Sequence, residues 1–269
     1  MIGTTEIILG GVGLAAGFVD AIAGGGGLLT VPALWLTGLY DQRFVGLQNP
    51  QAALATNKGQ SVWGSGMAFL RFYHSPLLDR KRMGLSFLMG FVGAVGGVFV
   101  MLRIPRDFLQ PVVMVMLMAV GVFMIFYRPP MTKCRGQAPP HARVTAGRMP
   151  ALLGAVAIAA GIGFYDGFFG PGTGVFLILA FVLYFKDLLH EASANAKVVN
   201  FASNLGAVAV FLPMGLIEWR LALPMAVGQA VGGWMGAHVT VRRGVRLVRV
   251  MLVVVSLAMV ARLAWQLIS

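Results

Sequence analysis

The chain has 269 residues, of which 58% are hydrophobic and only 11% are charged, and its mean hydropathy is +0.82. A soluble domain carries roughly 25% charged residues, so this composition excludes an ordinary soluble protein and indicates an integral membrane protein. The formal net charge of +12 comes from arginines and lysines that lie mostly between apolar runs, which indicates a membrane-orientation signal and no nucleic-acid partner.

The apolar runs are continuous and close to twenty residues long, which predicts membrane-spanning helices and not the ten-residue strands of a barrel. The first stretch, 6–39, is too long for one span and short for two, and a glycine cluster interrupts it. The stretch 150–185 has the same character. We expect each stretch to form a helical hairpin whose break lies at membrane depth. Full spans are predicted at 51–70, 84–102, 108–127, 193–213, 221–241 and 247–267.

Three loops carry most of the positive charge, and we expect them to be cytoplasmic. These loops are 71–82, 128–148 and 242–249. The short turns 103–107 and 214–220 then face outward, as do both termini, although Arg103 and Arg106 weaken the first assignment. The expectation is a multi-pass protein of a bacterial-type inner (plasma) membrane.

The halves of the chain repeat one another. Asp20 and Asp166 lie 146 residues apart, each beside a glycine cluster, and Lys58 and Lys197 lie 139 apart. Equivalent loops of the two halves face opposite sides, which predicts inverted-topology repeats, each a glycine-broken hairpin plus three transmembrane helices. The all-α protein would then have eight to ten helical segments. Its parts are a first repeat at 1–128, a cytoplasmic linker at 129–148 and a second repeat at 149–269.

The four repeat-related charges lie within or at the start of apolar segments, where a charge costs at least about 2.5 kcal/mol. One interpretation is that Lys58 and Lys197 bind an anion. The other is that each lysine neutralises an aspartate of its own or the opposite half, and the two roles can overlap. Asp20 and Asp166 are accordingly expected to be proton carriers or members of structural ion pairs.

Polar residues accompany each lysine at helical spacing. Ser61 and Ser65 follow Lys58 at i+3 and i+7, and two asparagines follow Lys197 in the same way. Hydroxyl and amide donors beside an ammonium group suit an oxyanion, although polar residues also join membrane helices by hydrogen bonds. The candidate polar ligands are Asn57, Lys58, Ser61, Asn195, Lys197, Asn200 and Asn204.

The glycine clusters would let backbone N–H groups approach an anion at the start of the helix after each break. The alternative is that small residues only allow tight helix packing, which is what we expect of the glycines at 90, 93, 96, 97, 228, 232, 233 and 236. The candidate anion cradles are Gly24, Gly25, Gly26 and Gly27 in the first half, and Gly170, Gly172, Thr173 and Gly174 in the second.

The segments 20–27, 55–58 and 166–174, with Pro32, resemble the TauE/SafE sulfite exporter family over essentially the whole chain. The resemblance implies secondary transport of sulfur-containing anions such as sulfite, thiosulfate or organosulfonates, usually outward and driven by the proton gradient. The second half departs from the first, because Ala196 matches Asn57 and Pro171 matches Gly25. We therefore expect unequal contributions from the two half-sites.

Our interpretation is an alternating-access anion exporter, not an enzyme, whose partners are a small anionic substrate and membrane lipid, with a homodimer compatible with its small-residue faces. A passive anion channel stays open as an alternative. An intramembrane aspartyl protease would also place two aspartates in the membrane, but the lysines beside them would keep both ionised. We expect no cofactor and no metal site, because acidic ligands are few and the histidines are scattered.

Overall fold

The computed structural model describes residues 3–43, 46, 49–105, 107–109, 111–113, 115–116, 119 and 148–243. The predicted span 247–267, most of the span 108–127 and nearly all of the linker 129–148 lie outside the described residues. Within the described ranges all regular secondary structure is helical, which confirms the predicted all-α membrane protein.

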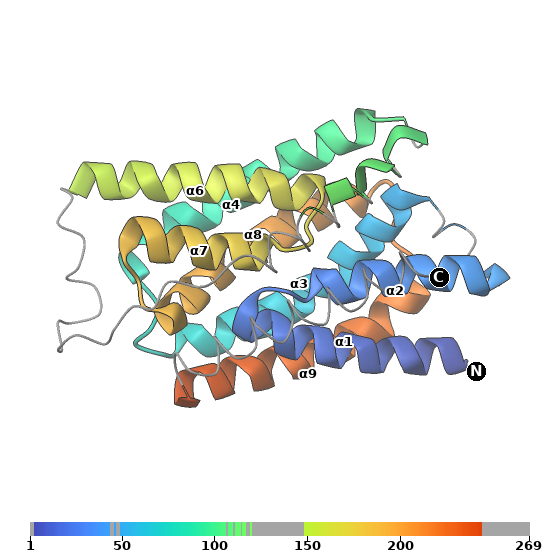
Figure 1. Ribbon diagram of the computed structural model, residues 1–269, viewed down its shortest axis with the longest axis horizontal. Helices are drawn as coiled ribbons and strands as arrows, with labels where there is room; N and C mark the ends of the chain where they lie inside the picture. The colour runs from blue at the N-terminus through green and yellow to red at the C-terminus, as the bar shows by residue number, and fades with distance from the viewer. Residues whose placement is uncertain are drawn as a thin grey trace.

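The described residues include eight helices with defined bounds, which fall into two series along the chain (Figure 1). The first series is α1 (Thr4–Ala23), α2 (Gly27–Tyr40), α3 (Pro50–Tyr73) and α4 (Arg80–Arg103). The second is α6 (Arg148–Phe168), α7 (Thr173–Phe185), α8 (Leu189–Phe211) and α9 (Trp219–Arg243).

Three helices of the described part are both long and apolar enough to cross a membrane: α1, α4 and the segment Ala151–Phe168 of α6. The helices α3, α8 and α9 have 24, 23 and 25 residues, so they reach about 35 Å at 1.5 Å per residue. The hydropathy of α3 and α8 is lower because these two helices carry buried lysines, amides and hydroxyls. These polar groups face protein, which is where a membrane helix tolerates them.

Both glycine-broken stretches form the predicted hairpins. Helix α1 ends because Gly24 adopts a left-handed conformation (φ 78°) and its N–H donates to the Asp20 carbonyl at 2.9 Å. Gly170 (φ 94°) and Gly172 (φ 85°) make the corresponding reversal between α6 and α7. Only glycine adopts such angles without strain. In Figure 1, α2 runs back beside α1 toward the N-terminal end of the molecule, and α7 runs back beside α6 toward the opposite end.

The outer helices pack through glycines. Helix α1 packs on α9 and α6 packs on α4, while α3 and α8 contact each other and lie between these pairs. A Cβ at Gly93 or Gly97 would overlap the α6 backbone, and one at Gly228 or Gly232 would overlap the α1 backbone. These four glycines therefore have the packing role expected for them. The tight pairs hold each broken hairpin against the central helices.

Candidate functional site

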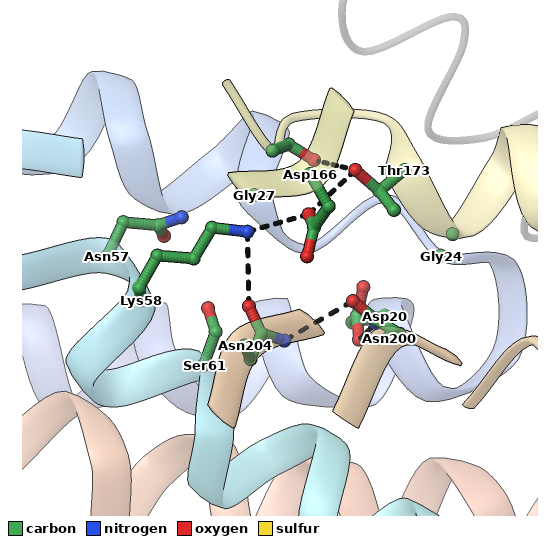
Figure 2. Close-up of a pocket in the computed structure, with 12 residues that line it drawn as sticks. Asp20, Gly24, Gly27, Asn57, Lys58, Ser61, Asp166, Thr173, Asn200 and Asn204 are labelled. Atoms are coloured by element: carbon green, nitrogen blue, oxygen red, sulfur yellow. Dashed lines mark hydrogen bonds and ion pairs between the residues drawn. The ribbon is translucent and has the colours of Figure 1, made fainter. Parts of the chain in front are cut away.

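A polar cavity lies where the two glycine breaks meet the central helices α3 and α8 (Figure 2). From the first half it is lined by Asp20, Gly24, Gly27, Asn57, Lys58 and Ser61. From the second half it is lined by Asp166, Gly170, Thr173, Gly174, Asn200 and Asn204. All twelve are among the candidate residues from the sequence, ten as substrate ligands and the two aspartates as proton carriers or members of structural ion pairs.

The two breaks touch each other at the cavity. A Cβ added at Gly24 would overlap the backbone of Gly174, and a Cβ at Gly174 would overlap Gly24. A Cβ at Gly27 would lie 3.3 Å from the Cα of Pro171, which is tighter than ordinary contact. Glycine is needed here for the close approach of two backbones, and this approach places the first turns of α2 and α7 beside one cavity.

Two ion pairs, one buried and one partly buried, join the halves. Lys58 Nζ of α3 lies 2.6 Å from Asp166 Oδ1 of α6, and Lys197 Nζ of α8 lies 2.8 Å from Asp20 Oδ2 of α1. Each lysine is thus neutralised by the aspartate of the opposite half. Removing one partner of such a pair leaves an uncompensated buried charge, which is strongly destabilising. All four charged residues thus form ion pairs across the halves, and the pairs give the halves a specific way to dock.

A chain of hydrogen bonds connects the two ion pairs. Figure 2 shows Lys58 reaching between Asp166 and Asn204, whose Oδ1 accepts from Lys58 Nζ at 3.2 Å. Asn204 Nδ2 donates to Asn200 Oδ1 at 3.3 Å, and Asn200 Nδ2 donates to Asp20 Oδ2 at 3.2 Å. A change of charge at one pair is therefore linked to the other through two amide side chains.

Several donors at the cavity keep hydrogen atoms that no described acceptor takes. Lys58 Nζ has three N–H groups and two described partners, Asp166 and Asn204. The Asn57 carbonyl oxygen accepts from Thr30 and Gln60, whereas its Nδ2 donates to no described group. The backbone N–H groups of Gly27 and Gly174 likewise have no backbone acceptor within the described ranges. These N–H groups belong to first helical turns, where the helix dipole favours an anion.

Comparison with known proteins identifies the family. A sequence model of the family described as "Sulfite exporter TauE/SafE" matches residues 9–263. The chain belongs to the TauE/SafE sulfite exporter family. The resemblance expected from the glycine and lysine motifs is thereby confirmed.

Relatives of this TauE/SafE protein are named as transporters without a stated solute. The chain is 36% identical to the probable membrane transporter protein ORF9 of a Sinorhizobium species, over 92% of this chain and 88% of the relative. It is 36% identical to the probable membrane transporter protein YfcA of Escherichia coli K12, over 94% and 87%. A probable membrane transporter protein of Haemophilus influenzae is 34% identical, over 94% and 92%. No solved structure matches the chain.

Some predicted site residues of the TauE/SafE protein do not line the cavity. Lys197 is fully buried behind Asp20. Gly26 donates its N–H to Asp20 Oδ1 at 3.3 Å, and the Gly25 carbonyl accepts from Leu28. Gly172 is the N-cap of α7. These residues lie next to the lining residues and fix their positions, Lys197 through its ion pair and the glycines through the backbone.

Asn195 belongs to a separate cluster at the junction of α7 and α8. Its Nδ2 donates to Asp187 at 2.9 Å, and its Oδ1 accepts from the Asp79 N–H at 2.9 Å. Arg82 completes this cluster, 2.6 Å from Asp79 and 3.1 Å from Asp187, with its guanidinium 3.9 Å from the Phe185 ring centre. Burial raises the pKa of Asp187 against the opposing effect of Arg82. The prediction that Asn195 contacts substrate is not supported by this placement.

The structure also reveals two supporting residues that the sequence did not indicate. Ser203 donates a short hydrogen bond to Asp166, and Thr30 donates one to Asn57. Ser203 lies six residues after Lys197, but the position six residues after Lys58 is Gly64. The repeat therefore carried no signal for Ser203.

Proposed function

We propose that the chain is a secondary transporter that exports sulfur-containing anions, such as sulfite, thiosulfate or organosulfonates. The observation that carries the proposal is the set of unused donors at the cavity, formed by Lys58, Asn57 and the N–H groups of Gly27 and Gly174. Converging donors around an ammonium group match the oxygens of an oxyanion. Family membership and the relatives' transporter names support the transport role and the sulfur chemistry.

The polarity of the cavity favours an anion over other cargoes. The carboxylates of Asp20 and Asp166 are each engaged by a lysine, so they are poorly placed to bind a cation. The donors that remain at the cavity match the oxygens of an oxyanion.

The opposed hairpins support an alternating-access cycle. The α1–α2 hairpin enters from one end of the molecule and α6–α7 from the other (Figure 1), as expected of inverted-topology repeats. Rocking of the two halves about the contact between Gly24 and Gly174 would open the cavity to each side in turn. The repeat boundaries 1–128 and 149–269 are part of this proposal.

The positive charges suggest the orientation. The start of α4, with Arg80, Lys81 and Arg82, lies at the same end of the molecule as the start of α6 and the end of α9 (Figure 1). We assign this end to the cytoplasm of a bacterial-type cell. Both termini would then lie outside the inner membrane.

Two alternatives differ from the carrier in what they require. A passive channel would give flux without saturation and without exchange of bound anions across the membrane. An aspartyl protease would need two carboxylates sharing one proton, whereas Asp20 and Asp166 are each paired with an ammonium group. We therefore retain the channel as the alternative and do not favour the protease.

The test is uptake of radiolabelled sulfite into liposomes that contain the purified protein, with thiosulfate, isethionate, sulfate and chloride as competitors. We expect saturable uptake that is stimulated by unlabelled anion inside. Lys58→Met should abolish it, while the control Lys81→Met, at the start of α4, should leave it unchanged. Folded protein that moves none of the sulfur anions would refute the proposal, and flux without saturation or exchange would indicate a channel.

A further inference from the structure

The charges around the cavity balance when all four groups are ionised. Lys58 and Lys197 supply two positive charges, and Asp166 and Asp20 supply two negative ones. A monovalent anion that entered alone would leave a net negative charge in a region of low dielectric constant, which is strongly unfavourable. One proton taken up by either carboxylate restores the balance. The question is which carboxylate takes it.

Asp166 is enclosed and held closely. Its Oδ1 lies 2.6 Å from Lys58 Nζ and accepts from Thr173 Oγ1 at 2.7 Å, and its Oδ2 accepts a short hydrogen bond from Ser203. The two hydroxyls also lie within hydrogen-bond distance of the Gly170 and Asn200 carbonyls, so the charged partner of Asp166 is Lys58, which stabilises the carboxylate form. The side chain is only 2% exposed.

Asp20 offers a place for a proton. Its Oδ2 accepts from Lys197 and Asn200, whereas the one described donor to Oδ1 is the Gly26 N–H, at 3.3 Å. The side chain is 15% exposed and lines the cavity. We propose that Asp20 takes up one proton when the anion binds while Asp166 stays ionised, an inference that rests on the proposed anion transport.

Protonation of Asp20 would itself create the attraction for the anion. Lys197 is fully buried and has no other described carboxylate partner, so its charge is left unbalanced once Asp20 is neutral. The other charged groups facing Asp20 are Lys58 and Asp166 across the cavity, and they neutralise each other. No titratable side chain of α2, α7 or α9 contacts Asp20 in the described part of the chain. The anion and the proton therefore bind cooperatively.

The experiment counts protons taken up per anion bound by the purified full-length protein. Calorimetric titrations with bisulfite and with methanesulfonate at pH 6, repeated in buffers of different ionisation enthalpy, give this number. We expect about one proton for the wild type. Asp20→Asn removes the proposed proton acceptor, so the anion that it binds should bring no proton and the count should fall to zero. Asp166→Asn leaves a net charge of +1 that the anion alone balances, so its count should also fall, and the two carboxylates are distinguished by infrared spectroscopy.

The outcomes separate this inference from the proposed function. Folded wild-type protein that binds neither anion refutes both. Binding with no proton uptake by the wild type, or one proton taken up by Asp20→Asn, overturns the inference and leaves anion transport standing. Infrared difference spectra then assign the proton to one of the two carboxylates, and they also serve if Asp20→Asn does not fold. The carboxylic acid band that appears with bisulfite should shift in Asp20→Glu and not in Asp166→Glu, and the reverse result would overturn the assignment.

Discussion

The cross-half ion pairs make a quantitative prediction for a double-mutant cycle on Lys58 and Asp166. The side chains are 3% and 2% exposed, so Lys58→Met leaves a buried carboxylate without its counter-charge. Breaking a buried pair in this way costs about 3–5 kcal/mol. With a melting shift of about 2–4 °C per kcal/mol for a chain of this size, Lys58→Met and Asp166→Asn should each lower the melting temperature by roughly 10 °C. The double variant Lys58→Met/Asp166→Asn should recover most of this loss, because no unpaired charge remains.

The assay is thermal unfolding of detergent-purified protein at pH 8, followed by tryptophan fluorescence and size-exclusion chromatography. The control is Lys58→Met/Asp20→Asn, which has the same net charge but leaves Asp166 and Lys197 without their partners. The losses of stability from the two substitutions should add in this variant, and we expect little folded protein. Equal recovery in both double variants would refute the pairing, because net charge alone would then explain stability.

Three further predictions concern the breaks, the donors and the α7–α8 junction. Gly24→Ala should lower sulfite flux at least tenfold and destabilise the fold by about 1–2 kcal/mol or more, because its φ of 78° and its contact with Gly174 exclude a Cβ. The control Gly11→Ala, where nothing lies within 4 Å, should retain flux, and equal effects would contradict the contact. Asn57→Asp keeps the Oδ1 acceptor for Thr30 and Gln60 but replaces the Nδ2 donor. Anion affinity measured by calorimetry should therefore fall at least about tenfold, or ~1.4 kcal/mol, whereas the control Asn195→Ala should change the affinity little. Burial raises the folded-state pKa of Asp187 above 3.8, so the folded state binds the proton more tightly than the unfolded state. The contribution of Asp187 to stability therefore falls as pH rises from about 3.8 to the folded-state pKa. Asp187→Asn should flatten that part of a stability–pH profile, and an unchanged profile would contradict the assignment.

The hairpins and the central helices could be predicted from the sequence because each contains residues that destabilise an ordinary membrane helix. Charged Lys58 and Lys197 in apolar helices need a partner or a ligand, and the glycine clusters need a left-handed turn or a close contact. These costs appear in the sequence without knowledge of the tertiary fold. The same reasoning led to all twelve residues that line the cavity.

The pairing of the charges could not be predicted, because it depends on how the halves cross. Lys58 could have met Asp20 of its own half, and the repeat relation is equally consistent with either partner. Contact between Gly24 and Gly174 brings Asp166 to Lys58 and Asp20 to Lys197. The position of Asn195 could not be predicted either. It lies two residues before Lys197, but its amide contacts Asp79 and Asp187 at the helix end.

The most direct test of the central claim is the position of the anion itself. We would determine the structure of the protein with selenite, a heavier analogue of sulfite, and locate selenium by its anomalous scattering. The donors at the cavity predict one site in contact with Lys58 Nζ, Asn57 Nδ2 and the N–H groups of Gly27 and Gly174. Selenium bound away from the contact between the two glycine breaks, or a cavity without selenium in protein that transports selenite, would contradict the claim.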